Sequence, residues 1–594
     1  MNQHIQLQKL SEDPVWKALL QLSRNSPQIH DPNFYISQSY KSSYFELTSF
    51  LDALHAPDAK ATACRFPARY FWLKKKLPLH DIDLNQCEGL FEFITRAPLE
   101  TASVVFATEN LAQPASMMGH IFFKFGGTNS NNIYVEHVIS FFTDLNDINF
   151  PKLIIQSLLT GKRGLYALSP YEQTRVHYLY EEQRNLWEYR LNLSEDEKIF
   201  LHYYFYELKD VSFTYYFHLF NCGTLVKNIL AILHPELLDD WSLWVTPLDV
   251  ARLLDQPSYV EKQVVQASSR WKIKALNESL SLDSSEEAKI EHRNFAELNF
   301  EKKNQKNQFL SFELALAYND YSYEKDQITK ADWNLNRQLL ITKKDKILPY
   351  GQLDISNYKK PSATIQDSQI FISGLESANS FISQAEPKDR ILLVGFLPAS
   401  HTLFEDNTQY QNESELKIGE VTLSYKPLTQ QVELNSFVLY SAISLQPSDP
   451  YTGGLSGLFR LGVEPKKQDN LGFKKSFFLE GGLGQTFRLL HDIDLFYLAK
   501  IGAESETEAY LAFAPQFGLI VREVFNMKTL FSVEHEFRLN RASYLSQSVT
   551  QVYNARRFSI AIQFNQYEKK ARRPDDMTPE NFSQNFVATY KLFF

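Results

Sequence analysis

The chain ends in the segment Phe586-Val-Ala-Thr-Tyr-Lys-Leu-Phe-Phe594, and this segment determines how its C-terminal half is interpreted. In a β-strand, side chains two residues apart lie on the same face of the sheet. The other face mixes polar and apolar residues, so the pattern predicts a strand with one apolar side. That apolar side carries Phe586, Ala588, Tyr590, Leu592 and Phe594.

The same two-residue alternation recurs through residues 307–594, which we predict to form an all-β antiparallel barrel. It is present in Leu310–Tyr318, Gly419–Tyr425 and Phe558–Phe564, and stretches rich in Asn, Asp, Gly, Ser and Lys separate such segments. About a dozen segments of this kind occur, in line with the even strand numbers of membrane barrels. An apolar final strand that ends in Phe resembles the closing strand of bacterial outer-membrane barrels. A soluble β-sandwich or barrel is the alternative.

Composition narrows the classes of function. Lys and Arg number 61 and Asp and Glu number 70, so the net charge of −9 argues against a nucleic-acid partner. Aromatic residues make up 14% of the chain, a high share that the aromatic girdles of a membrane barrel would explain. No run of about 18 or more apolar residues occurs, so no membrane-spanning helix is expected.

We predict four parts in chain order: a helical and mixed region at 1–100, a catalytic domain at 101–275, a linker at 276–306 and the barrel at 307–594. The linker is assigned to the stretch in which the composition becomes strongly polar. Within the catalytic domain, strands are expected over 101–145 and helices over 169–235.

The three cysteines, Cys64, Cys87 and Cys222, allow at most one disulfide bond. We predict that Cys64 pairs with Cys87, which requires an oxidising compartment such as the periplasm. Two ordinary buried thiols are the alternative. No metal site and no cofactor are expected, because the histidines show no ligand spacing.

Cys222 is then the remaining thiol, and its sequence context suggests a nucleophile. Asn221 is a typical N-cap, which places Cys222 in the first turn of a helix, where free amide hydrogens and the helix dipole lower the pKa of a thiol. The backbone amides of Cys222 and Gly223 could form an oxyanion hole at this helix start.

A thiolate nucleophile needs an imidazole partner, and His120, at the start of an earlier strand, is the candidate. His137, on the following strand, could orient His120 as a third member, and Glu136 is a weaker candidate for that role. A buried cysteine and a satisfied core histidine without catalytic roles are the alternative.

Three segments resemble one family and occur in the same order. They are Pro114-Ala-Ser-Met-Met-Gly-His-Ile-Phe-Phe-Lys-Phe, Glu181-Glu-Gln-Arg-Asn-Leu-Trp-Glu-Tyr-Arg-Leu-Asn-Leu-Ser and Tyr215-Tyr-Phe-His-Leu-Phe-Asn-Cys. The family is that of the Lnb-type lipoprotein N-acyltransferases, and the resemblance covers roughly residues 50–240, including Cys64 and Cys87. It implies an α+β, permuted papain-like (NlpC-like) domain in which the His strand precedes the Cys helix. The family's histidine and cysteine correspond to His120 and Cys222, and its second polar residue to His137.

The resemblance also implies the activity, a thiol acyltransferase reaction. An acyl chain would move from a phospholipid donor to the α-amine of a lipoprotein acceptor through a thioester on Cys222. The protein would lie in the outer membrane with its N-terminal domain in the periplasm. The N-terminus lacks the apolar core of a signal peptide, and the sequence leaves open whether such a peptide has been removed. The alternatives are a cell-wall or protein cysteine peptidase or amidase, and a non-enzymatic outer-membrane pore or scaffold.

Overall fold

The computed structural model forms two compact units, one of residues 1–271 and 321–327 and one of residues 272–320 and 328–594. The segments 114–117 and 217–219 of the family resemblance lie outside the residues that the structure describes. The described residues are 2–23, 26–27, 29–37, 42–110, 118–143, 156, 160–216, 220–238, 244–280, 284–299, 304–344, 355–378, 389–469, 471–505, 509–539, 541–569 and 582–594.

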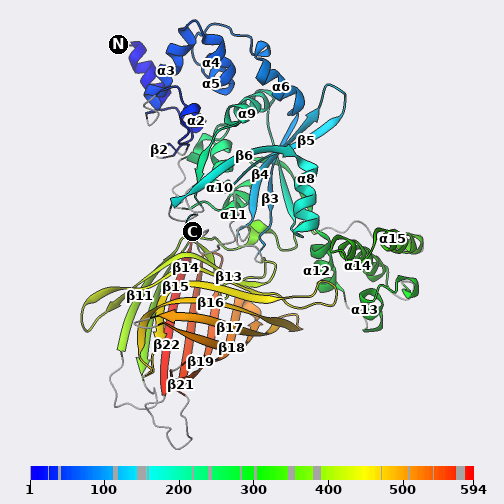
Figure 1. Ribbon diagram of the computed structural model, residues 1–594, viewed down its shortest axis with the longest axis vertical. Coiled ribbons are helices and arrows are strands. Elements are labelled where there is room, and N and C mark those ends of the chain that lie inside the picture. The colour runs from blue at the N-terminus through cyan, green and yellow to red at the C-terminus, as the bar shows by residue number, and fades with distance from the viewer. Residues whose placement is uncertain are drawn as a thin grey trace, which may run out of the picture. The chain divides into compact units, whose positions relative to one another are not determined.

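The first unit is built on a seven-stranded antiparallel sheet with the order β8-β6-β5-β4-β3-β7-β9 in the described part of the chain. Figure 1 labels β3, β4, β5 and β6 of this sheet. The strands predicted over 101–145 are present. The helices predicted over 169–235 are interrupted by β7 and β8; in β7, Trp187 and Tyr189 are buried on one face, as in a strand. The strands are β3 (Thr101–Ala107), β4 (His120–Thr128), β5 (Tyr134–Thr143), β6 (Lys162–Pro170), β7 (Leu186–Leu191), β8 (Phe213–Tyr215) and β9 (Val260–Gln266).

Helices cover both faces of this sheet. One face buries Ile121, Phe123 and Phe125 of β4 against the larger core, and the other buries Phe122 near the short helices α8 and η5. The helices are α1 (Asn2–Ser11), α2 (Pro14–Leu19), α3 (Ser43–His55), α4 (Ala59–Arg65), α5 (Pro67–Lys74), α6 (Glu88–Arg96), α8 (Tyr171–Val176), η5 (His177–Glu181), α9 (Glu195–Leu208), α10 (Cys222–Leu230) and α11 (Pro247–Leu254).

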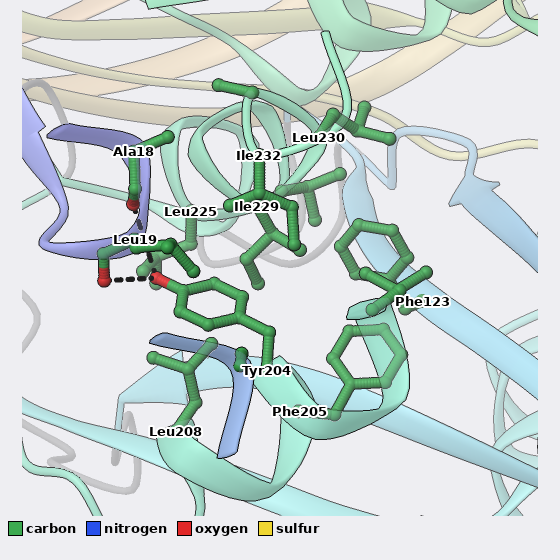
Figure 2. Packing of buried hydrophobic residues seen from close by; sticks show 14 of the residues in the cluster. Ala18, Leu19, Phe123, Tyr204, Phe205, Leu208, Leu225, Ile229, Leu230 and Ile232 are labelled. Atoms are coloured by element: carbon green, nitrogen blue, oxygen red, sulfur yellow. Dashed lines mark hydrogen bonds between the residues drawn. The ribbon is translucent and has the colours of Figure 1, made fainter. Parts of the chain in front are cut away.

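Helix α10 is fixed in place by its apolar face (Figure 2). Leu225 and Ile229 of this helix share a buried core with Phe123 of β4 and Phe205 of α9. The hydroxyl of Tyr204 donates at 3.3 and 3.2 Å to the two carbonyl oxygens that end α2. The start of α10 is therefore positioned against the sheet by tertiary packing.

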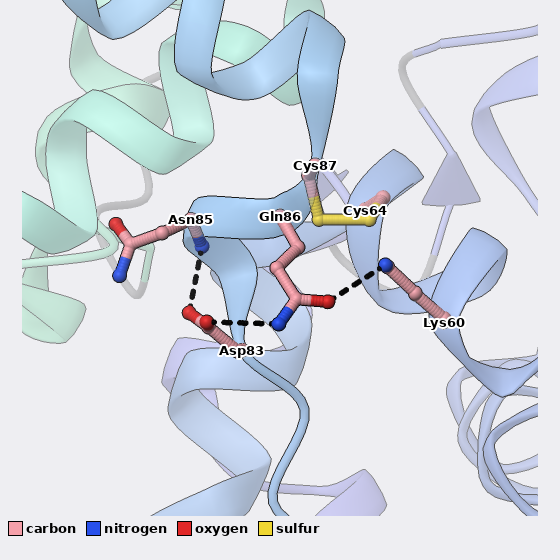
Figure 3. The surroundings of a disulfide bond; sticks show 6 residues. All are labelled: Lys60, Cys64, Asp83, Asn85, Gln86 and Cys87. Carbon is pink, nitrogen blue, oxygen red and sulfur yellow. Dashed lines mark hydrogen bonds between the residues drawn. A yellow bond between two sulfur atoms is a disulfide. The ribbon is translucent and has the colours of Figure 1, made fainter.

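The predicted disulfide between Cys64 and Cys87 is confirmed, with a Cα–Cα distance of 5.3 Å. It joins the end of α4 to the residue that precedes α6 (Figure 3). Close by, Lys60 donates to the side chain of Gln86 at 3.0 Å, and Gln86 donates to Asp83 at 3.2 Å. The bridge thus links two helices of the N-terminal region.

The second unit contains an antiparallel barrel (Figure 1). Pairing between β11 and β13 closes it. The described sheet has thirteen strands; without the three-residue β12 (Ala399–His401) it is a ring of twelve, as predicted. The twelve are β10 (Gln369–Ala378), β11 (Asp389–Leu397), β13 (Glu413–Lys426), β14 (Gln431–Leu445), β15 (Ser456–Lys467), β16 (Phe473–Leu490), β17 (Ile493–Ser505), β18 (Ala509–Arg522), β19 (Met527–Arg538), β20 (Tyr544–Asn554), β21 (Phe558–Lys569) and β22 (Phe582–Phe593).

The barrel strands expose apolar side chains and bury polar ones, which is the reverse of the pattern in a water-soluble protein. On β17, Tyr497 and Ile501 are 38% and 65% exposed, whereas Asp494 and Lys500 are buried. The final segment follows the predicted pattern, with Phe586, Tyr590, Leu592 and Phe594 exposed. An apolar exterior around a polar interior is the arrangement of a membrane barrel.

The start of the barrel was predicted too early. Residues 310–318 belong to helix α14 (Gln305–Glu324), helix α15 (Lys330–Lys344) follows, and the first barrel strand is β10. Leu310, Leu314 and Tyr318 are buried at four-residue intervals, a spacing that fits a helix as well as a strand. The predicted linker is also partly helical, because it contains α13 (Ser284–Glu291) and follows most of α12 (Ser269–Ser279). None of the described helices is long and apolar enough to cross a membrane.

Candidate functional site

Cys222 is the first residue of α10, as the sequence predicts. The side chain of Asn221 caps the helix by accepting a hydrogen bond from the amide of Thr224 at 3.0 Å, and its own amide group donates to the carbonyl of Val245 at 2.8 Å. At Gly223, a Cβ atom would lie 2.9 Å from backbone atoms of Thr246 and Pro247. The helix tip is thus held closely against the start of α11, and Cys222 is 3% exposed.

The sulfur of Cys222 reaches the edge of β4. Pairing between β4 and β5 ends at Phe123 and Ile139, although pairing with β3 continues to His120. The amide of Ile121 lies beyond the last β4–β5 pair and donates a hydrogen bond to the Cys222 sulfur. The structure therefore brings the predicted nucleophile to the residue that follows His120.

Aromatic and charged groups surround the His120 ring. Its centroid lies 5.9 Å from that of Phe122 and 6.2 Å from that of Tyr178. Burial lowers the pKa of His120 to about 3, and the positive charge of Arg184 acts in the same direction. The negative charge of Glu182 opposes these two effects and raises the pKa of His120. Glu182 is therefore a carboxylate that interacts electrostatically with this imidazole.

The structure does not bring His137 together with His120. The register of the two strands pairs His137 with Phe125, five residues along β4 from His120, a separation of about 17 Å in an extended strand. The weaker candidate, Glu136, forms an ion pair with Lys124 at 2.8 Å. Neither His137 nor Glu136 therefore lies beside His120 as a third catalytic residue.

Glu182 and Arg184 occupy the surroundings of His120 instead. Arg184 donates to Glu182 at 2.8 Å, to the Thr108 carbonyl at 2.5 Å and to the Ala107 carbonyl at 3.0 Å. Because Ala107 pairs with His120, Arg184 fixes the strand end opposite the histidine. Both residues belong to the segment Glu181–Ser194 that resembles the family. That resemblance was the feature of the sequence that pointed to them.

Tyr215 is another residue that sequence reasoning missed. It lies at the end of β8 and is buried, and its hydroxyl donates a hydrogen bond to the sulfur of Cys222. A hydroxyl donor stabilises the thiolate form of the cysteine. The one feature of the sequence that points to Tyr215 is its closeness to Cys222 in the chain, since Tyr215 begins the segment that ends in Cys222.

The prediction that the helix start lowers the pKa of Cys222 is wrong in direction. Burial raises the pKa of the thiol, and the hydrogen bonds from Ile121, Gly223 and Tyr215 offset only part of that effect. Removing a charged sulfur from water costs more than a few donors return. Near pH 7, the site therefore rests as a neutral thiol and a neutral His120 imidazole.

The raised pKa leads to a prediction for alkylation by iodoacetamide. The rate of Cys222 modification should rise with pH and reach half its plateau above pH 9.0, the ordinary value for this thiol. Tyr215→Phe, which removes one donor, should move the midpoint higher still. Mass spectrometry of the full chain measures the rate, and Cys222→Ala provides the blank. A midpoint at or below pH 9.0 would contradict the argument.

Comparisons with known proteins match parts of the chain to three families. Residues 92–256 match the family described as the Lnb N-terminal periplasmic domain. Residues 8–76 and 380–575 match two families described as domains of unknown function. No curated protein matches the chain.

Solved structures similar to part of the chain include three bacterial proteins. An anion-selective porin from Comamonas acidovorans is 10% identical, with a TM-score of 0.20, over 39% of this chain and 99% of the porin. OmpT of Vibrio cholerae is 9% identical, with a TM-score of 0.21, over 38% of this chain and 98% of OmpT. The β-domain of the Bordetella autotransporter BrkA is 12% identical, with a TM-score of 0.22, over 39% of this chain and all of that domain.

The apolar exterior of the closed barrel and the family match together define the class. This is an outer-membrane β-barrel protein with an N-terminal domain in the periplasm. Residues 92–256 of that domain are similar to the family described as the Lnb N-terminal periplasmic domain.

Proposed function

We propose that the protein is a cysteine-dependent acyltransferase that moves an acyl chain from a phospholipid to the α-amine of a lipoprotein. The observation that supports this most is the placement of Cys222, buried at the first turn of α10, a helix that shares its core with Ile121, the residue next to His120. We also infer a permuted papain-like fold, because the strand with His120 precedes the helix with Cys222 and that helix packs on the sheet.

In the first step, the neutral imidazole of His120 takes the thiol proton as the Cys222 sulfur attacks the ester carbonyl of the phospholipid. The carbon–sulfur bond forms and the carbonyl oxygen gains negative charge. Backbone amides of Cys222 and Gly223 at the helix start are the donors for this oxyanion. The ester carbon–oxygen bond then breaks, and His120 returns its proton to the leaving lysophospholipid.

In the second step, the α-amine of the lipoprotein attacks the thioester. The carbon–nitrogen bond forms, the carbon–sulfur bond breaks, and the proton lost by the amine returns to the sulfur through His120. A thioester keeps much of the reactivity of the acyl group, so an amide can form without ATP. The side chain of Asn221 is committed to its cap and to Val245, so its role is to hold the helix start.

The covalent link to a membrane barrel supports a lipid donor. The domain cannot diffuse away from the membrane that holds the barrel, which raises the effective concentration of phospholipid at the site. A soluble cell-wall hydrolase would have no need of this link.

The proposal is tested by capturing the intermediate. The full chain is reconstituted in phospholipid vesicles without an acceptor, and we expect an acyl group on Cys222 that hydroxylamine removes. A peptide with an N-terminal diacylglyceryl cysteine should then clear this group and gain one amide-linked acyl chain. Mass spectrometry follows both species. Release of free fatty acid with no acylated peptide, or cleavage of the peptide, would instead support a hydrolase.

A further inference from the structure

We propose that the barrel is closed at both ends by its own chain, so that it anchors the protein and does not conduct ions. The inference concerns residues 369–594 alone and does not depend on the acyl-transfer proposal. Three groups of contacts carry it: one at each end of the barrel and one along the wall between them.

The first end is that at which β10 begins and β22 ends, and residues 399–412 close it. Glu405 in this segment is fully buried and pairs with Lys591 of β22 at 2.5 Å. Lys528 of β19 donates to the Glu405 carbonyl at 2.8 Å, and Asn554 of β20 donates to the Phe404 carbonyl at 3.3 Å. The segment thus contacts β19, β20 and β22, none of which is next to it in the chain.

The positions of these strands in the ring show that the closure crosses the opening. The segment leads into β13, whose first residue is Glu413; counting round the ring of twelve, β19 lies six strands from β13 in either direction. Glu413 nevertheless pairs with Lys528 of β19 at 2.6 Å and with Arg522 of β18 at 2.9 Å. Side chains from opposite walls therefore meet across the opening at this level.

The opposite end is closed by Lys467, the last residue of β15. Its ammonium group donates to the hydroxyl of Ser583 on β22 at 2.9 Å and lies 4.4 Å from the ring centre of Tyr567 on β21. β22 is five strands away from β15 round the shorter side of the ring. Arg538 of β19 donates to the Lys467 carbonyl at 2.5 Å, so three distant strands meet at this residue.

Between the two ends, the inner wall carries ion pairs of alternating sign. Glu464 and Glu480 flank Arg460 at 2.9 and 3.1 Å, and Glu480 and Glu534 flank Lys500 at 3.1 and 2.8 Å. These five side chains are at most 20% exposed. Each charge is already neutralised by a neighbour, so a passing ion would have to replace partners that are largely removed from water.

Conductance of the full chain tests this closure. Purified protein is inserted into planar phospholipid bilayers, with an open porin as the positive control, and we expect a current indistinguishable from that of the bilayer without protein. Heat-modifiable migration of the same samples shows that the barrel is folded and inserted. Steady unitary steps of porin size from the unaltered protein would overturn the proposal.

A second variant shows whether the named segments form the closure. Residues 402–410 are replaced by a Gly-Ser linker and Lys467 by serine in the same chain, and we expect unitary steps that the unaltered protein lacks. The matched control is Lys475→Ser, which removes a lysine paired with Glu433 at 3.2 Å and 44% exposed, and it should stay silent. A folded, inserted double variant that also stays silent would overturn the assignment of the closure to these segments.

Discussion

Cys222→Ala is expected to lower the initial rate of lipoprotein N-acylation by about 10⁴-fold or more. The sulfur forms the covalent bond to the acyl group, and removal of a nucleophile from a catalytic unit leaves only the contributions of binding and oxyanion stabilisation. His120→Asn should cause a loss of about 10² to 10⁴-fold, because it removes the general base and acid. Full-length variants are assayed with phospholipid vesicles and a diacylglyceryl-cysteine peptide.

Control variants separate chemistry from folding. Cys222→Ser keeps the size of the side chain and its hydrogen-bonding capacity, so it should fold like the unaltered protein and yet lose nearly all activity. His137→Asn should leave the rate within a few-fold, because β-strand register places His137 far from His120. If Cys222→Ala kept a tenth of the rate, or if His137→Asn were as inactive as His120→Asn, the assignment of the site would be wrong.

Local signals explain which parts of the site could be predicted. Asn221 is an N-cap in both sequence and structure, because capping depends on residues within one helical turn. The register between β4 and β5 depends on where the two strands meet, and no local pattern specifies it; this is why His137 was placed beside His120. The pKa of Cys222 depends on burial by the whole core, which a helix start alone does not reveal.

Glu182 and Arg184 show a second limit. They follow the short helix η5, and Arg184 reaches the carbonyls of Ala107 and Thr108, more than seventy residues earlier in the chain. Such contacts have no periodicity, so residue patterns cannot find them. Here the family resemblance marked the segment without assigning a role to either residue.

The barrel was predictable because period-two alternation is local and repeats in many strands. The same rule failed for 310–318, where apolar residues satisfy both a strand and a helix spacing, and Ala, Leu and Glu favour the helix. The cross-barrel pairs of Glu413 could not be predicted at all, because they join strands from opposite sides of the ring.

Arg69 of α5 gives the prediction with the largest effect on stability. Its side chain is fully buried and ion-paired with Glu46 of α3 at 3.1 Å and with Glu207 of α9 at 3.2 Å. It also donates to the carbonyl of Phe34 at 2.8 Å. One guanidinium thus connects three segments of the first unit, and no other cation is paired with these carboxylates among the described residues.

Arg69→Ala should lower the free energy of unfolding of the first unit by about 3–5 kcal/mol, because it leaves Glu46 and Glu207 buried without their partner. Pulse proteolysis of the full chain in detergent should show the midpoint in urea falling by roughly 1–2 M. Arg69→Lys should recover only part of this loss, since an ammonium cannot reproduce the planar set of donors. The matched control is Arg96→Ala, whose pair with Glu92 is exposed, and it should cost at most about 1 kcal/mol. Equal midpoints for Arg69→Ala and Arg96→Ala would show that the buried pairs contribute no more than a surface pair, and the three segments would then have to be held together by apolar packing alone.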